Sequence, residues 1–124
     1  MPHRILIVDD EPNIAASLEF LLARGGYDVR VAHNGEDALA EASRFDPQLV
    51  LLDVMMPKLN GYEVCQRIRQ GPAGRAVKIV MLTARGRDVD ERKGMELGAD
   101  LYVTKPFSTR ELVARVKELL APSN

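Results

Sequence analysis

Residues 4–12 read RILIVDDEP, in which an uninterrupted apolar run ends in two aspartates and a glutamate. A strand without polar alternation is typical of a sheet that is covered on both faces. Four further strand-sized runs follow along the chain: VRVA (29–32), LVLL (49–52), KIVML (78–82) and LYVT (101–104). Between these runs apolar residues recur at helical spacing, most clearly over 14–22 and 112–120. We therefore expect strands and helices to alternate.

This alternation predicts an α/β fold with one five-stranded parallel sheet and helices on both of its faces. The expected strand order is 2-1-3-4-5, which is the flavodoxin-like, doubly wound arrangement. A chain of 124 residues with 46% hydrophobic and 28% charged residues suits one globular domain, expected over residues 1–121. Residues 122–124 are expected to form a tail or the start of a linker.

Charge and cysteine content narrow the classes of function. The 17 basic and 18 acidic residues leave a formal net charge of -1, so composition gives no reason to expect direct binding to nucleic acid or to a membrane. Cys65 is the only cysteine, and the sequence shows no signal peptide and no membrane-spanning apolar run. These features predict a cytoplasmic location and exclude a disulfide scaffold.

Aspartates that follow two of the strands indicate a metal site. Asp9 and Asp10 come directly after residues 5–8, and Asp53 comes directly after residues 49–52. If these two strands are neighbours, the three carboxylates meet in one crevice at the carboxyl edge of the sheet. Three anions a few ångströms apart repel one another by several kcal/mol, so the cluster requires a cation. Oxygen ligands without a nearby histidine or cysteine favour Mg²⁺.

Two more polar residues follow strands that should end at the same edge. Thr83 comes after residues 78–82, and Lys105 comes after residues 101–104. A metal, a carboxylate, a hydroxyl and an ammonium together can cradle a phosphoryl group. A carboxylate whose surroundings are neutralised in this way can act as a nucleophile and form an aspartyl phosphate. Asp53 is the best candidate for this role.

Five motifs in this order carry a resemblance to a known family. They are VDDEP (8–12), LLDVMMPKLNGYEV (51–64), MLTAR (81–85), GAD (98–100) and KPF (105–107). Each motif alone is a weak signal, but the whole set at successive strand ends is highly specific. The chain resembles the receiver domain of two-component response regulators over essentially its whole length. Its pattern is most similar to the receivers of DNA-binding transcriptional regulators.

The resemblance implies a function and a metal site. Asp53 would accept a phosphoryl group from a sensor histidine kinase. The chain would not otherwise be an enzyme, since it would catalyse only its own phosphorylation and dephosphorylation. Mg²⁺ would be held by Asp10, Asp53 and the backbone carbonyl of Met55, with Asp9 acting through a water.

The resemblance also assigns residues to phosphoryl binding and to switching. Thr83 and Lys105 would hold the phosphoryl oxygens, and the Lys105–Pro106 peptide bond would be cis. On phosphorylation Thr83 would shift and Tyr102 would rotate inward, which is a population shift between two packings. This shift would change the output surface, which is the name used here for the face made by three elements. These elements are the strand at residues 101–104, the helix expected before it and the helix expected after it. The expected output is control of transcription.

The lifetime of the phosphoryl group is expected to depend on Met55 and Arg85. In receivers these two positions flank the line along which water attacks the aspartyl phosphate. Met55 is apolar and cannot orient a water, and Arg85 is a cation that cannot act as a base. The sequence therefore predicts slow hydrolysis.

Charged residues on the output surface suggest a homodimer of the phosphorylated chain. They are Arg92, Lys93, Glu96, Asp100, Arg110, Glu111, Arg115 and Lys117. An equally good explanation is a solvated surface without a partner. Leu101 weakens the dimer hypothesis, because similar regulators carry a second aspartate at this place. The sequence leaves open the cognate kinase and whether the chain stands alone or belongs to a longer regulator.

Structural roles and other protein classes are the alternatives to this interpretation. The acidic pair before Pro12 could cap a helix, and Thr83 and Lys105 could be ordinary strand and loop residues. A Mg²⁺-dependent phosphatase would need a second aspartate two residues after its nucleophile on the first strand, where this chain has Glu11. A flavin or nucleotide binder would need uncharged phosphate-binding amides at the same turn, which is acidic here. Neither His3 nor His33 is expected to have a functional role.

Overall fold

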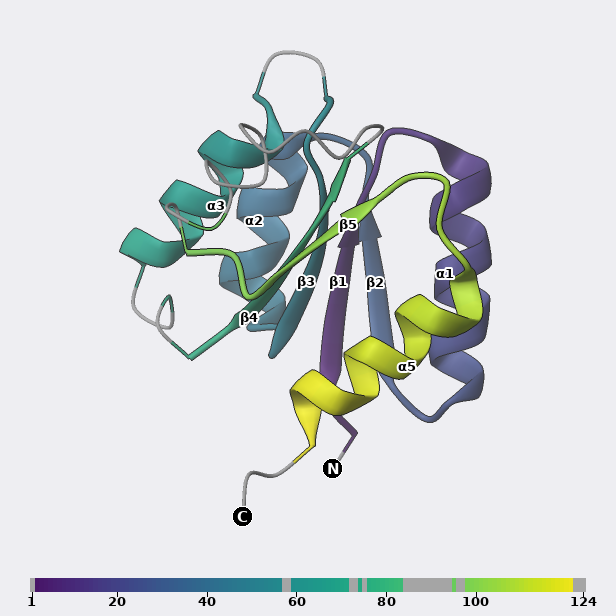
Figure 1. The fold of residues 1–124 in the computed structure, drawn as a ribbon. Coiled ribbons are helices and arrows are strands. Elements are labelled where there is room, and N and C mark those ends of the chain that lie inside the picture. The colour runs from purple at the N-terminus through teal and green to yellow at the C-terminus, as the bar shows by residue number, and fades with distance from the viewer. Residues whose placement is uncertain are drawn as a thin grey trace.

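The computed structural model describes residues 2–56, 59–71, 74, 76–83, 95 and 98–121 (Figure 1). The strands are β1 (Arg4–Val8), β2 (Asp28–Ala32), β3 (Leu49–Asp53), β4 (Lys78–Thr83) and β5 (Leu101–Thr104). The helices are α1 (Pro12–Arg24), α2 (Gly35–Phe45), α3 (Gly61–Gln70) and α5 (Thr109–Leu120). All five predicted strands are confirmed, with their ends displaced by at most one residue.

The sheet has the predicted topology. Its strands follow the order β2-β1-β3-β4-β5, and each neighbouring pair is parallel. Figure 1 shows α1 and α5 on one face of the sheet and α2 and α3 on the other. The register pairs Val8 of β1 with Leu52 of β3, and Asp53 with Leu82 of β4. The residues that follow these strands therefore meet at one edge.

Alternate side chains of the central strands build two separate cores. Ile5 and Ile7 point toward α1 and α5, where they join a cluster that contains Leu18 and Leu112. Leu6 and its neighbours on the same face join a second cluster under α2 and α3. All five residues of β3 are buried, because helices cover both faces of the sheet. Each fully buried aliphatic side chain stabilises the fold by about 1.5–3 kcal/mol.

Side-chain caps fix the beginnings of three helices. The backbone amide of Asp37 donates to Asn34 Oδ1 at 2.8 Å in α2, and Ser108 Oγ accepts from the amide of Glu111 in α5. In α3 the N-cap is Asn60, whose Oδ1 accepts from the amide of Glu63. Such caps satisfy amides that would otherwise lack partners in the first turn. The first helix, α1, differs because its N-cap residue makes no such bond.

One arginine ties α3 to the chain that leads into β5. The Arg69 guanidinium donates to the carbonyl oxygens of Gly74 and Gly98 and pairs with Asp100 Oδ2 at 2.9 Å. Asp100 Oδ2 also accepts from the backbone amide of Ile79 at 2.8 Å. Asp100 was expected among the charges of the output surface, but its carboxylate is engaged by α3 and β4. The helix expected before β5 lies outside the described residues.

Candidate functional site

Buried polar groups concentrate at the carboxyl edge of the sheet. Asp9 follows β1, Asp53 ends β3 and Thr83 ends β4, and their relative exposures are 0%, 2% and 4%. Within the described part of the chain these are the only buried polar or charged residues. A buried carboxylate is costly unless a partner compensates its charge, so two of them at one edge make this edge the candidate functional site.

Four acidic side chains converge on this edge. Asp9, Asp10, Glu11 and Asp53 each offer a carboxylate oxygen, and these oxygens lie within 4.8 Å of one another. The sequence predicted the convergence of the three aspartates but gave no role to Glu11. The cluster could hold a metal ion, and its oxygen-only donor set fits a hard divalent cation. Glu11 could have been suspected because it directly follows the aspartate pair.

Lys105 reaches into the acidic cluster from the loop after β5. Its Nζ lies 3.2 Å from Asp9 Oδ2, 3.2 Å from Glu11 Oε1 and 3.6 Å from Asp53 Oδ1. Its backbone amide donates to the carbonyl oxygen of Thr83, and the Lys105–Pro106 peptide bond is cis. Only 12% of its side chain is exposed, so Lys105 is a largely enclosed counter-ion and not a surface lysine.

The environment of Asp53 perturbs its proton equilibrium. Burial and the charge of Asp9 raise the pKa of Asp53 to about 7, although the Lys105 ammonium and the Met55 amide oppose the shift. The Met55 amide donates to Asp53 Oδ1 at 3.2 Å. Burial lowers the pKa of Lys105, but the charges of Asp53 and Asp9 outweigh it and the net shift is upward. Extra positive charge at this edge would therefore favour the ionised form of Asp53.

We expect the ionisation of Asp53 to lower the stability of the metal-free protein as the pH rises from 3.8 to about 7. In this range the folded protein keeps a proton on Asp53 that the unfolded chain has released, so the rise in pH favours unfolding. Asp53→Asn removes this titration and should be more stable than the parent at pH 8, by on the order of 3 kcal/mol. The gain should be small at pH 4.

The measurement is urea denaturation in EDTA at both pH values. Asp28→Asn changes an exposed carboxylate on β2 and serves as the matched control. A stability difference between Asp53→Asn and the parent that does not change with pH would contradict the raised pKa.

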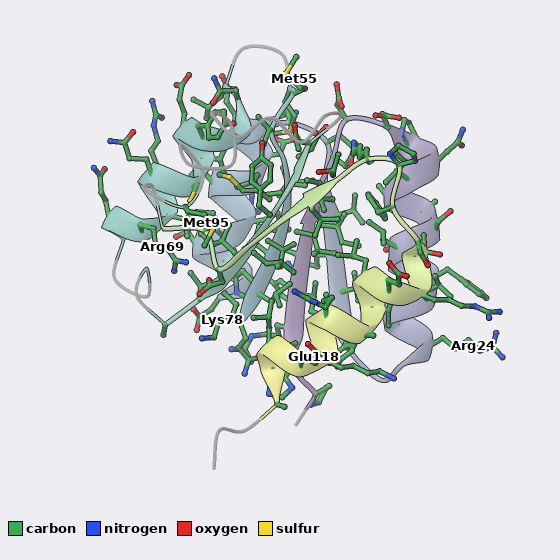
Figure 2. The ribbon with its side chains drawn as sticks, in the orientation of Figure 1. Arg24, Met55, Arg69, Lys78, Met95 and Glu118 are labelled. Atoms are coloured by element: carbon green, nitrogen blue, oxygen red, sulfur yellow. The ribbon has the colours of Figure 1, made fainter. Side chains whose placement is uncertain are left out.

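The loop after Asp53 is shaped by a glycine and carries an exposed methionine. A Cβ on Gly61 would lie 2.4 Å from the Asp53 carbonyl oxygen and 2.8 Å from Val54 Cα, so only glycine fits where α3 begins. The side chain of Met55 is 68% exposed, and Figure 2 shows it at the outer end of the sheet. Arg85, the second residue expected to govern hydrolysis, lies outside the described residues.

Tyr102 lies on the edge strand β5 and packs against the core under α2 and α3. Its hydroxyl is buried and has no hydrogen-bond partner among the residues that the structure describes. A buried hydroxyl without a partner is costly. The rotation of this ring on phosphorylation stays a prediction.

Helix capping does not explain the acidic run. The N-cap of α1 is Glu11, and neither it nor an aspartate before it provides the side-chain oxygen that caps a helix. Asp9 Oδ1 accepts from the Glu11 amide at 2.9 Å, which is a local turn contact. Pro12 is the first residue of the helix. The carboxylates of the run instead face Lys105 and Asp53.

A doubly wound parallel sheet with this acidic, lysine-bearing edge defines a flavodoxin-like receiver fold. The chain belongs to the response regulator receiver domain family, whose family model matches residues 5–117. It is 50% identical to the alkaline phosphatase synthesis transcriptional regulatory protein PhoP of Bacillus subtilis (strain 168) over 99% of this chain. The match covers 50% of that protein.

Two of the solved structures that share the fold illustrate the similarity. The chemotaxis protein CheY4 of Vibrio cholerae gives a TM-score of 0.92 at 28% identity and covers 97% of this chain and 100% of its own. The response regulator DrrB of Thermotoga maritima, an OmpR/PhoB homolog, gives a TM-score of 0.87 at 38% identity. That match covers 97% of this chain and 53% of DrrB. The chain thus spans about half the length of PhoP and of DrrB.

Across the part of the chain that the structure describes, no helix combines the length and apolar character needed to span a membrane.

Proposed function

We propose that this chain receives a phosphoryl group from a sensor histidine kinase on Asp53 and thereby switches an output. The observation that carries the proposal is the environment of Asp53. Asp53 is only 2% exposed, the Lys105 ammonium lies 3.6 Å from its Oδ1, and the buried residue Thr83 ends the neighbouring strand β4. Family membership supports a partner of this kind. In this proposal Asp53 is the nucleophile, Lys105 the counter-charge and Thr83 the hydroxyl, all at the carboxyl edge of the sheet.

In the proposed reaction an Asp53 carboxylate oxygen forms a bond to phosphorus. The bond from phosphorus to the donor breaks, and the donor leaves with its electron pair. The Lys105 ammonium and the Thr83 hydroxyl would each bind a phosphoryl oxygen, so their contribution would be charge neutralisation and orientation. Burial strengthens both effects because it excludes water.

Asp10, Asp53 and the backbone carbonyl of Met55 would hold a divalent cation, with Asp9 acting through a water. The convergence of their carboxylate oxygens with that of Glu11 supports this assignment. When bound, Mg²⁺ would supply positive charge for the phosphoryl oxygens. Asp10 is exposed whereas Asp9 is fully buried, so of these two aspartates Asp10 is the one that an ion arriving from solvent can meet directly.

The signal would pass from Thr83 to Tyr102 and so to the output surface. Thr83 and Thr104 are paired across β4 and β5, and Tyr102 lies two residues earlier on β5. A phosphoryl group that attracts Thr83 would favour the packing in which Tyr102 fills the vacated space. A homodimer of the phosphorylated chain through the output surface would be one consequence. Arg110, Glu111 and Arg115 are exposed on α5 and could take part.

The proposed output is control of transcription in the cytoplasm. The name of the Bacillus relative describes a transcriptional regulatory protein about twice the length of this chain. The receiver itself is not proposed to touch nucleic acid, because its formal net charge is -1.

Purified protein should take up one phosphoryl group per chain from a small acyl phosphate such as acetyl phosphate when Mg²⁺ is present. Uptake should fall at least tenfold in EDTA, because the carboxylates then lack a counter-charge for the incoming anion. Intact-protein mass spectrometry gives the stoichiometry. Continuous release of phosphate over many turnovers without a phosphorylated chain would indicate a phosphatase and refute the proposal.

A further inference from the structure

Glu11 occupies the N-cap of α1 without capping it. Its backbone has φ -92° and ψ 107°, yet its side chain accepts no hydrogen bond from the first helical turn. That turn contains Pro12 and no acidic residue. Aspartate at this position stabilises a helix by accepting from the second or third amide, but glutamate is not among the favoured N-caps. The carboxylate of Glu11 therefore makes no contact with the amides of the first turn.

The carboxylate reaches across the molecule to Lys105. Glu11 Oε1 lies 3.2 Å from Lys105 Nζ, although 94 residues separate the two in sequence. The Glu11 backbone is fixed on both sides, because its amide donates to Asp9 Oδ1 and its carbonyl oxygen accepts from the Ala15 amide. The side chain thus extends from an anchored point, and its contact with Lys105 follows from the turn after β1.

Three carboxylates share the Lys105 ammonium, and Asp53 is the most distant of them. Asp9 and Glu11 both lie at 3.2 Å from Nζ, whereas Asp53 lies at 3.6 Å. Asp9 is fully buried, but the side chain of Glu11 is 58% exposed. The ammonium has three N–H donors, so binding an oxygen of a phosphoryl group on Asp53 would take a donor away from one of these carboxylates. Loss of the Lys105 contact should destabilise the fold least at Glu11, because water can solvate the exposed Glu11 carboxylate but not the buried one of Asp9.

We propose that Glu11 is a positioning residue that engages the Lys105 ammonium in the unphosphorylated chain and thereby slows phosphoryl uptake. This inference rests on the proposed function of Asp53. The contact stabilises the starting state but not the state in which Lys105 binds the phosphoryl group, so its loss should raise the uptake rate. Since one member of the ion pair is largely exposed, the increase should be about two- to fivefold.

The test compares initial rates of uptake from acetyl phosphate at saturating Mg²⁺ for the parent, Glu11→Gln and Glu11→Asp. Glutamine removes the charge but keeps the length of the side chain. Aspartate keeps the charge but is one methylene shorter, and it is a favoured N-cap that would turn back to the first turn of α1. Glu19→Gln makes the same charge change on the exposed side of α1 and serves as the control.

Both Glu11 variants should take up phosphate about two- to fivefold faster than the parent, while Glu19→Gln should match the parent. If only Glu11→Gln is faster, the residue acts through its charge and not by holding Lys105, and the inference is wrong. Equal or slower rates in both variants also overturn it. Melting temperatures separate a rate effect from loss of fold. A parent that takes up no phosphate contradicts the proposed function itself.

Discussion

Asp53→Ala is expected to abolish phosphoryl uptake and to leave the fold intact. Asp53 is the carboxylate that combines near-complete burial, the Lys105 ammonium at 3.6 Å and a position beside the end of β4, where Thr83 lies. Asp9 is also buried, but both of its carboxylate oxygens are engaged, Oδ2 by Lys105 and Oδ1 by the Glu11 amide, whereas the Lys105 and Met55 contacts of Asp53 both fall on Oδ1. Asp10 is exposed. No other described carboxylate of the acidic cluster is thus equally suited to be the nucleophile.

The side chain of Asp53 should be dispensable for folding. Its removal relieves repulsion from Asp9 and the cost of burying a charge, so the variant should unfold at the same temperature as the parent or higher. Intact mass after incubation with acetyl phosphate and Mg²⁺ measures the uptake. Asp28→Ala, which removes an exposed carboxylate of β2, should be labelled like the parent. Undiminished labelling of Asp53→Ala would show that the acceptor lies elsewhere.

Met55→Asn combined with Arg85→Glu is expected to shorten the lifetime of the phosphoryl group by about ten- to a hundredfold. Hydrolysis needs a water in line with the bond to be broken, and a polar side chain that positions it lowers the barrier. The Met55 side chain is 68% exposed at the loop that follows Asp53 and offers no strong hydrogen bond to water. Its link to Asp53 runs through the backbone amide, which the substitution retains.

Decay is measured on phosphorylated protein after removal of the donor. The single variant Met55→Asn separates the contribution of Met55 to the decay rate from that of Arg85. Met95→Asn replaces another exposed methionine, 48% exposed just before β5 (Figure 2), and should leave the decay rate unchanged. Mg²⁺ binding of the double variant should match the parent, because Met55 is expected to act on the metal through its carbonyl oxygen only. An unchanged or slower decay would refute the role of these two positions.

The sequence alone determined the sheet and the place of its site. The apolar runs of β1 and β3 lack polar alternation because both faces are buried, and this property is visible without a structure. The meeting of the aspartates that follow these strands was also predictable, because parallel strands bring their carboxyl ends to one edge of the sheet. Local chemistry also placed Pro12 at the beginning of α1.

Tertiary structure decided which charges meet and how strongly they perturb one another. Glu11 and Lys105 are 94 residues apart, and Arg69 and Asp100 are 31 apart, so no local pattern links them. The raised pKa of Asp53 arises from burial and from its distance to Asp9, both of which exist only after the chain has packed. Periodicity in the sequence specifies which residues are buried. The pairing of polar groups depends on side-chain reach across that buried edge, and only the folded chain fixes it.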